Sequence, residues 1–222
     1  MMVLIMTSAC IFDMDGVLID SGAHHRSAWK ALLEEIGVTP TRPEFWRLTI
    51  GRPAEEAVPL LLGRRVSAAD ARRLALRKRE LYSEFSAQGL RAVPGVQDFV
   101  GTLVRDGVPR AVGTSASRGD VDTLLGSLGL RRYFDVIVTA EDVRLGKPDP
   151  AVYLEVARRM GEPPAACLVF EDSLVGIHAA RRAGMRAIGV TTAHTSDELH
   201  EAGAEATIAD FEGVEWSAIV KP

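Results

Sequence analysis

Two aspartates stand two positions apart at the end of an apolar segment. Asp13 and Asp15 follow the run Cys10 to Phe12 and precede a glycine. In an extended segment, residues i and i+2 point to the same face, so these two carboxylates are expected to be neighbours. Two anions that lose solvent at the end of a buried strand repel each other, and at least one becomes neutral unless a counter-charge is present. The spacing therefore predicts a positive charge between them.

Three later segments also place polar side chains after apolar runs. They are Thr114, Ser115 and Arg118 in GTSASR, Lys147 in GKPDP, and Glu171 and Asp172 in FEDS. In a doubly wound parallel sheet, ligands bind at the carboxyl ends of the strands. We therefore expect all four polar segments to meet at one edge of a sheet.

The acidic residues of these segments predict a hard divalent metal ion. Four carboxylates that converge on one point cannot all stay ionised without a cation; they belong to Asp13, Asp15, Glu171 and Asp172. Oxygen ligands suit Mg²⁺, and the absence of histidine and cysteine from the segments disfavours zinc. We expect Mg²⁺, together with Lys147, to supply the missing positive charge.

A divalent cation, a lysine and hydroxyl donors favour phosphoryl transfer, in which catalysis consists mainly of positioning and neutralising a charged group. Asp13 is the candidate nucleophile, because a strand-end carboxylate can form an aspartyl-phosphate. Asp15 is the candidate general acid for the leaving oxygen and, later, the base for water. The pattern predicts a phosphate ester as substrate.

The elements that position these residues alternate between two patterns from Val93 onward. Strand-like runs are PRAVGTS, FDVIVTA, ACLVFED, RAIGVTT and EATIADF, and helix-like runs separate them. This alternation predicts an α/β fold with a doubly wound, Rossmann-like parallel sheet. Residues 22–91 have a helical pattern and no convincing strand. We expect an α/β core of residues 1–21 and 92–222, with residues 22–91 inserted as a helical cap.

The composition is that of an ordinary soluble globular protein, with 222 residues, 47% hydrophobic and 25% charged. A net charge of −4 argues against general nucleic-acid binding, because no basic excess is available for phosphates along a duplex. The apolar N-terminus has no basic flank and is interrupted by Thr7 and Ser8, so a signal peptide or membrane span is not expected. Cys10 and Cys167 lie in apolar runs, which fits buried, reduced thiols in a cytoplasmic protein.

Taken in order, DMDGVLIDS, GTSASR, GKPDP and FEDSLVGIHAARRAGM resemble the four motifs of the haloacid dehalogenase superfamily, and they span Asp13 to Met185. The chain is most similar to the branch that contains β-phosphoglucomutase and small sugar-phosphate phosphatases, whose helical cap follows the first motif. The resemblance implies that Asp13 is the nucleophile and that Asp15 is the acid/base, with its backbone carbonyl on the metal ion. It implies that Ser115, or Thr114 if the match slides by one, donates to the phosphate within a segment that includes Ala116 and Arg118. Lys147 is then the residue that neutralises the phosphate charge, and Glu171 and Asp172 are Mg²⁺ ligands.

In the cap, the resemblance implies that His25 and Lys78 couple closure to chemistry. His25 is equally compatible with a packed or solvated helix residue, and a tryptophan at the position of Trp29 more often packs than contacts substrate. We include both, with Arg52 and Lys78, as candidate substrate contacts. Mutases of the branch hold a second phosphate with an arginine shortly after a glycine. Here Arg52 directly follows Gly51, and an alanine occupies the expected place of that arginine. This departure favours hydrolysis.

The leading expectation is a Mg²⁺-dependent phosphatase for a small phosphorylated metabolite, a sugar phosphate by the resemblance. One alternative is a phosphosugar mutase of the β-phosphoglucomutase type. The other is a phospho-accepting signalling domain, which also combines a doubly wound sheet with acidic ligands, a hydroxyl residue and a lysine. The helical insertion and Asp15 argue against that domain. Monomer and homodimer are both compatible with the sequence.

Overall fold

The computed structural model describes residues 7–39, 44–87 and 89–220. Six parallel strands form one sheet in the order β3-β2-β1-β4-β5-β6. The strands are β1 (Ala9–Phe12), β2 (Arg110–Gly113), β3 (Val136–Val138), β4 (Cys167–Glu171), β5 (Arg186–Val190) and β6 (Ala206–Ile208). The predicted doubly wound α/β fold is confirmed, and each strand falls within a predicted strand-like segment. The apolar lead-in of residues 1–6 lies outside the described residues.

The register of the central strands explains why the polar segments meet. Phe12, the last residue of β1, pairs with Val112 on one side and with Phe170 on the other. The residues that follow β1, β2 and β4 therefore leave the sheet side by side at its carboxyl edge. The backbone N–H of Asp13 still donates to the Phe170 carbonyl at 3.0 Å, which continues the ladder to the first aspartate.

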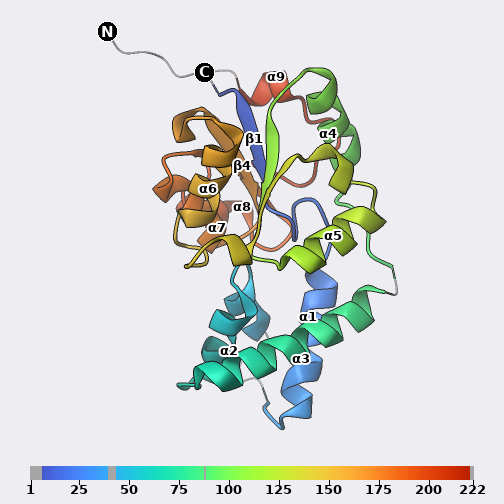
Figure 1. Cartoon of the computed structure of the whole chain (residues 1–222), viewed down its shortest axis with the longest axis vertical. Helices are drawn as coiled ribbons and strands as arrows, with labels where there is room; N and C mark the ends of the chain where they lie inside the picture. The colour runs from blue at the N-terminus through green and yellow to red at the C-terminus, as the bar shows by residue number, and fades with distance from the viewer. Residues whose placement is uncertain (1–6, 40–43, 88, 221–222) are drawn as a thin grey trace.

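Helices cover both faces of the sheet (Figure 1). On the core they are α4 (Val96–Arg105), α5 (Arg118–Ser127), α6 (Ala151–Met160), α7 (Leu174–Arg182), α8 (Ser196–Glu201) and α9 (Trp216–Ile219). Alternate residues of β1 face opposite layers: Phe12 packs with the side of α4, whereas Ile11 packs with the side of α6 and α7. Burial on both faces is typical of a parallel sheet and accounts for its continuous apolar strands.

The insertion is helical throughout its described part. It contains α1 (Gly22–Glu35), the 3₁₀ helix η1 (Phe45–Thr49), α2 (Ala54–Leu62) and α3 (Ala68–Ser86). Figure 1 shows α1, α2 and α3 together beyond the end of the sheet where α5 begins. They share an apolar cluster that includes Trp29, Val58 and Leu74. Because this cluster is separate from the two clusters of the sheet, we propose residues 22–91 as a cap on the α/β core.

The remaining sequence expectations concern cysteines and membranes. Cys10 and Cys167 are free and buried, as expected. Among the described ranges, no helix combines the length and the apolar character needed to cross a bilayer. The short helices α8 and α9 were not predicted, because segments of six and four residues carry too little periodicity to be recognised.

Candidate active site

Three carboxylates meet at the carboxyl edge of the sheet. One ligand oxygen each of Asp13, Glu171 and Asp172 lies within 4.8 Å of the others. Asp13 follows β1, and the other two come at the end of the neighbouring strand β4, so the parallel register brings them together. All three side chains are buried. The sequence predicted that four carboxylates would converge; the fourth, that of Asp15, is not part of this cluster, because it is bound by Ser21 and His25.

Lys147 is the cation among these carboxylates. Its Nζ lies 2.8 Å from Asp13 Oδ1 and 2.7 Å from Glu171 Oε1, and the side chain is only 1% exposed. Burial opposes its charge, but the two carboxylates keep the pKa of Lys147 well above its ordinary value. The lysine therefore stays protonated and links the first and last motifs.

One lysine does not neutralise three buried carboxylates. Burial raises the pKa of Asp13 to about 7, although Lys147 acts in the opposite direction. The pKa of Asp172 is also raised, by burial and by the neighbouring charges of Glu171 and Asp13. An all-oxygen cluster that is short of positive charge fits Mg²⁺, which prefers carboxylate ligands.

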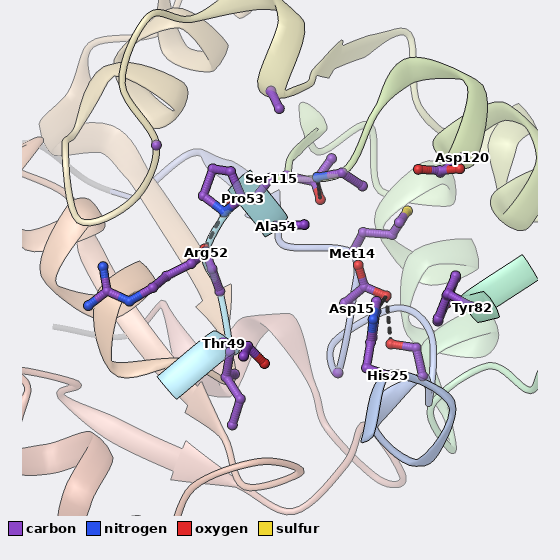
Figure 2. Close-up of a pocket in the computed structure, with 18 of the residues that line it drawn as sticks. Met14, Asp15, His25, Thr49, Arg52, Pro53, Ala54, Tyr82, Ser115 and Asp120 are labelled. Atoms are coloured by element: carbon purple, nitrogen blue, oxygen red, sulfur yellow. Dashed lines mark hydrogen bonds and ion pairs between the residues drawn. The ribbon is translucent and has the colours of Figure 1, made fainter. Parts of the chain in front are cut away.

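Asp15 is hydrogen-bonded toward the cap. Its Oδ1 accepts from Ser21 Oγ at 2.6 Å and lies 3.0 Å from His25 Nε2. The other ring nitrogen of His25, Nδ1, lies 2.6 Å from Lys78 Nζ. Figure 2 shows Asp15 facing His25, with Tyr82 beside them. The first motif and the cap thus form one chain of polar groups.

The charges along this chain fix the position of its protons. Burial opposes ionisation of Asp15, but His25 and Ser21 hold its pKa at about 2. Burial lowers the pKa of Lys78 to about 8, and burial and Lys78 together lower that of His25. At neutral pH we infer an ionised Asp15 and a charged Lys78 with neutral His25 between them. His25 then donates from Nε2 to Asp15 and accepts at Nδ1 from Lys78.

The predicted hydroxyl residues lie at the same edge. The Ser115 hydroxyl donates to the Gly51 carbonyl of the cap at 2.9 Å, and Thr114 Oγ1 accepts from the Ala116 N–H at 3.1 Å. A Cβ at Gly51, where φ is +72°, would lie 2.2 Å from Ser173 Oγ. The cap loop approaches the core closely at this point, and a residue with a side chain would not fit.

Arg118 has a different position from the one expected. Its guanidinium donates to Asp142 Oδ2 at 2.7 Å, and the side chain is 46% exposed. Arg118 is not among the residues that line the cavity, because it begins α5 and its side chain turns toward Asp142. We therefore leave it out of the proposed phosphate site.

A cavity of about 730 Å³ lies between the cap and the carboxyl edge. The core contributes Asp13, Asp15, Thr114, Ser115, Ala116, Lys147 and Asp172, and the cap contributes His25, Trp29, Trp46, Arg52, Lys78 and Tyr82. Figure 2 shows the Arg52 guanidinium directed away from Asp15. Sequence reasoning missed other wall residues. Among them are Tyr82, one helical turn after Lys78, and Trp46, on a 3₁₀ helix that no pattern marked.

Comparisons with known proteins agree with this geometry. A family model described as haloacid dehalogenase-like hydrolase matches residues 7–184. The validoxylamine A 7′-phosphate phosphatase of Streptomyces hygroscopicus subsp. limoneus is 34% identical, over 96% of this chain and 99% of its own. The fructose-1-phosphate phosphatase YqaB of Escherichia coli (strain K12) is 36% identical, over 81% of this chain and 94% of its own length. A crystal structure of β-phosphoglucomutase from Clostridium difficile shares the fold, with a TM-score of 0.85 at 23% identity and 96% coverage of each chain.

Proposed function

Because the chain belongs to the haloacid dehalogenase-like hydrolase family and is a phosphoric monoester hydrolase, we propose that it is a Mg²⁺-dependent phosphatase acting through an aspartyl-phosphate on Asp13. The observation that carries the proposal is the contact of Asp13 with Lys147, 2.8 Å long, in a cavity shared with Asp15. Family membership also favours an enzyme over the receiver-like signalling domain.

In the first step, an Asp13 oxygen attacks the phosphorus atom while the bond from phosphorus to the leaving oxygen breaks. The leaving oxygen takes a proton and departs as an alcohol. We propose that Asp15 relays this proton from His25 Nε2, 3.0 Å away, while Lys78 Nζ replaces it with a proton at His25 Nδ1, 2.6 Å away. The phosphoryl group is then covalently bound to Asp13.

In the second step, water attacks the phosphorus atom of the aspartyl-phosphate. Asp15 accepts the proton of the water, the bond between phosphorus and Asp13 breaks, and inorganic phosphate leaves. The net reaction consumes one water molecule and yields an alcohol and phosphate. Asp15 passes the proton of the water back to His25, His25 returns one to Lys78, and all four side chains, with Asp13, are again in their starting states.

The remaining residues hold the phosphoryl oxygens and the metal ion. Lys147 has a third N–H beyond the two that face Asp13 and Glu171, and we propose that it donates to a phosphoryl oxygen. The hydroxyl of Thr114 or Ser115 is the proposed second donor. Asp13, Asp172, Glu171 and the Asp15 backbone carbonyl are the proposed Mg²⁺ ligands. When bound, Mg²⁺ neutralises the carboxylates and the phosphoryl charge.

The proposed substrate is a sugar phosphate or a similar polyhydroxylated phosphate ester. The names of the two phosphatase relatives are those of enzymes for such compounds. Trp29, Trp46 and Tyr82 offer aromatic surface on the cap side of the cavity, and aromatic rings combine apolar contact with adaptable hydrogen bonding. Hydrolysis is favoured over the mutase reaction because the Arg52 guanidinium is directed away from Asp15.

The test is phosphate release from a panel of phosphorylated sugars, polyols and nucleotides with Mg²⁺, with Asp13→Asn as the matched control. We expect release that the control lacks. β-Glucose 1-phosphate distinguishes the two reactions: a phosphatase yields free glucose, whereas a mutase yields glucose 6-phosphate. If the wild type and the control behave identically with every ester, the proposal is wrong.

A further inference from the structure

We propose that the hydroxyl of Tyr153 is a positioning group for Lys147 and that it acts through Glu171. Tyr153 lies in α6, is fully buried and is not among the residues that line the cavity. It therefore has no contact with a substrate and is not a catalytic residue. The inference rests on the proposed function, because it concerns the lysine that would bind the phosphoryl group.

The hydroxyl and the lysine share one acceptor atom. Tyr153 Oη donates to Glu171 Oε1 at 3.1 Å, and Lys147 Nζ donates to the same oxygen at 2.7 Å. The Lys147 ammonium also lies 4.9 Å from the centre of the tyrosine ring, within the range of a cation–π contact. Tyr153 thus contacts Lys147 with its ring and fixes the acceptor of Lys147 with its hydroxyl.

The other Glu171 oxygen is also held. Glu171 Oε2 accepts from the Ser173 backbone N–H at 2.6 Å. A Cβ at Gly176 would lie 1.7 Å from Glu171 Oε1, so the backbone of α7 closes a further side. The carboxylate therefore has one well-defined position. A fixed Glu171 leaves Lys147 few alternatives to its contact with Asp13.

The ring of Tyr153 is itself fixed by packing against β2. A Cβ at Gly113 would lie 3.2 Å from two ring carbons, so the ring fits because that position has no side chain. Phenylalanine would fill the same space. A buried hydroxyl is unfavourable unless it is hydrogen-bonded, and in the described part of the chain its hydrogen-bond partner is Glu171. The need to fill the core therefore does not explain why residue 153 is a tyrosine rather than a phenylalanine. The hydrogen bond from its hydroxyl to Glu171 does.

The test is Tyr153→Phe, which removes only the hydroxyl. Without the hydrogen bond from that hydroxyl, the side chains of Glu171 and Lys147 can adopt other conformations. We therefore expect kcat to fall about tenfold with KM changed less than about twofold, as for removal of one buried hydrogen bond. Tyr133→Phe is the matched control, because it removes a hydroxyl that accepts from Arg132 at 3.0 Å on the exposed surface. It should behave as the wild type. Unchanged kcat in Tyr153→Phe would overturn the proposal.

A second measurement does not depend on turnover. Titration calorimetry with inorganic phosphate in the absence of Mg²⁺ reports on anion binding by Lys147 apart from the metal ion, for which Glu171 is also a proposed ligand. Thermal melts confirm that each variant is folded. We expect weaker phosphate binding in Tyr153→Phe and in Glu171→Gln, and no further weakening in the double variant, because the hydroxyl acts through Glu171. Additive losses in the double variant would contradict that route. If the wild type binds phosphate but hydrolyses no ester, the proposed function fails while this inference is still tested.

Discussion

At the residue scale, the Asp15 carboxylate is hydrogen-bonded to a histidine of the cap, which is the proposed source of the proton for the leaving group. Asp15 has a pKa of about 2, so at neutral pH it is ionised and its nearest donors are Ser21 and His25. A carboxyl group with such a low pKa is almost entirely deprotonated at neutral pH and needs another group as the source of a proton. The sequence predicted Asp15 as the acid but carried no sign that its carboxylate would lie within hydrogen-bond distance of a histidine ring.

We therefore expect His25→Asn to affect substrates according to their leaving groups. A sugar alkoxide needs a proton, so its hydrolysis should slow by about 100-fold, within the range for general acid catalysis. p-Nitrophenyl phosphate has a leaving group that is stable without a proton, and its rate should fall less than about tenfold. Steady-state kinetics with both esters, with His178→Asn as control, checks this. Equal losses for the two esters would argue that His25 has only a structural role.

Removal of the metal ion should be visible as a loss of stability. A ligand that binds only the folded state stabilises it, by about 2.7 kcal/mol at 100 times its dissociation constant. We expect Mg²⁺ to raise the Tm of the wild type and EDTA to reverse the rise. Asp172→Asn removes one carboxylate of the cluster and should show little or no Mg²⁺-dependent shift in differential scanning fluorimetry. An undiminished shift would place the metal ion elsewhere.

At the element scale, the sheet could be predicted because buried parallel strands are continuous apolar runs between helices. The same pattern implied the common edge at which Asp13, Lys147 and Asp172 meet. Contacts that depend on helix packing could not be predicted. Tyr153 contacts Glu171 only because α6 packs over β2, and Ser21 contacts Asp15 only because the chain turns before α1. No local pattern encodes those distances.

Asp142 joins three elements and should make stability depend on pH. It forms a capping box with Thr139 and pairs with Arg118 of α5 and Arg159 of α6. Despite partial burial, these partners lower its pKa from 3.8 to about 2. The unfolded chain therefore binds the proton more readily than the folded one. The resulting stabilisation, about 2 kcal/mol, is complete above about pH 5 and is lost as the pH falls toward 2.

Asp142→Asn is the corresponding variant. We expect its free energy of unfolding to be lower than that of the wild type by about 2 kcal/mol at pH 7, and the difference to shrink as the pH falls from about 5 to 2. Urea denaturation at several pH values measures both quantities. Asp149→Asn changes a nearby acid that caps α6 through Ala151 and has no arginine partner among the described contacts. It is the control for a general charge effect.

At the scale of the whole molecule, the charge is divided unevenly. Half of the 26 lysines and arginines lie within residues 22–91, which make up less than a third of the chain, whereas most of the 30 acidic residues lie outside that range. Within the described residues, two arginine–carboxylate ion pairs cross from the cap to the core: Arg47 of η1 to Glu198 of α8, and Arg79 of α3 to Asp120 of α5. The opposite net charges of the two parts favour their approach, and the net positive charge of the cap attracts anionic substrates.

Glu198→Gln removes the charge partner of Arg47 and should weaken the contact between the cap and the core. Arg47 Nη2 lies 2.7 and 2.6 Å from the two Glu198 oxygens, but both side chains are about one-third exposed, so the pair contributes less than about 1 kcal/mol. We expect kcat/KM to fall two- to fivefold at low salt, and the difference from the wild type to shrink at 0.5 M NaCl. Glu201→Gln, at the other end of α8, is the control. A salt-independent difference would exclude an electrostatic role.

The division of the cavity into a core edge and a cap wall determines at which step of the reaction the enzyme can discriminate between substrates. The reacting carboxylates and Lys147 come from the core, whereas Trp29, Trp46 and Tyr82 come from the cap. In the proposed cycle the alcohol has already departed when water attacks the phosphorylated enzyme, so different esters converge on one shared intermediate. If breakdown of that intermediate limits turnover, a whole series of good substrates will reach the same maximal velocity and differ only in the concentration required to reach it.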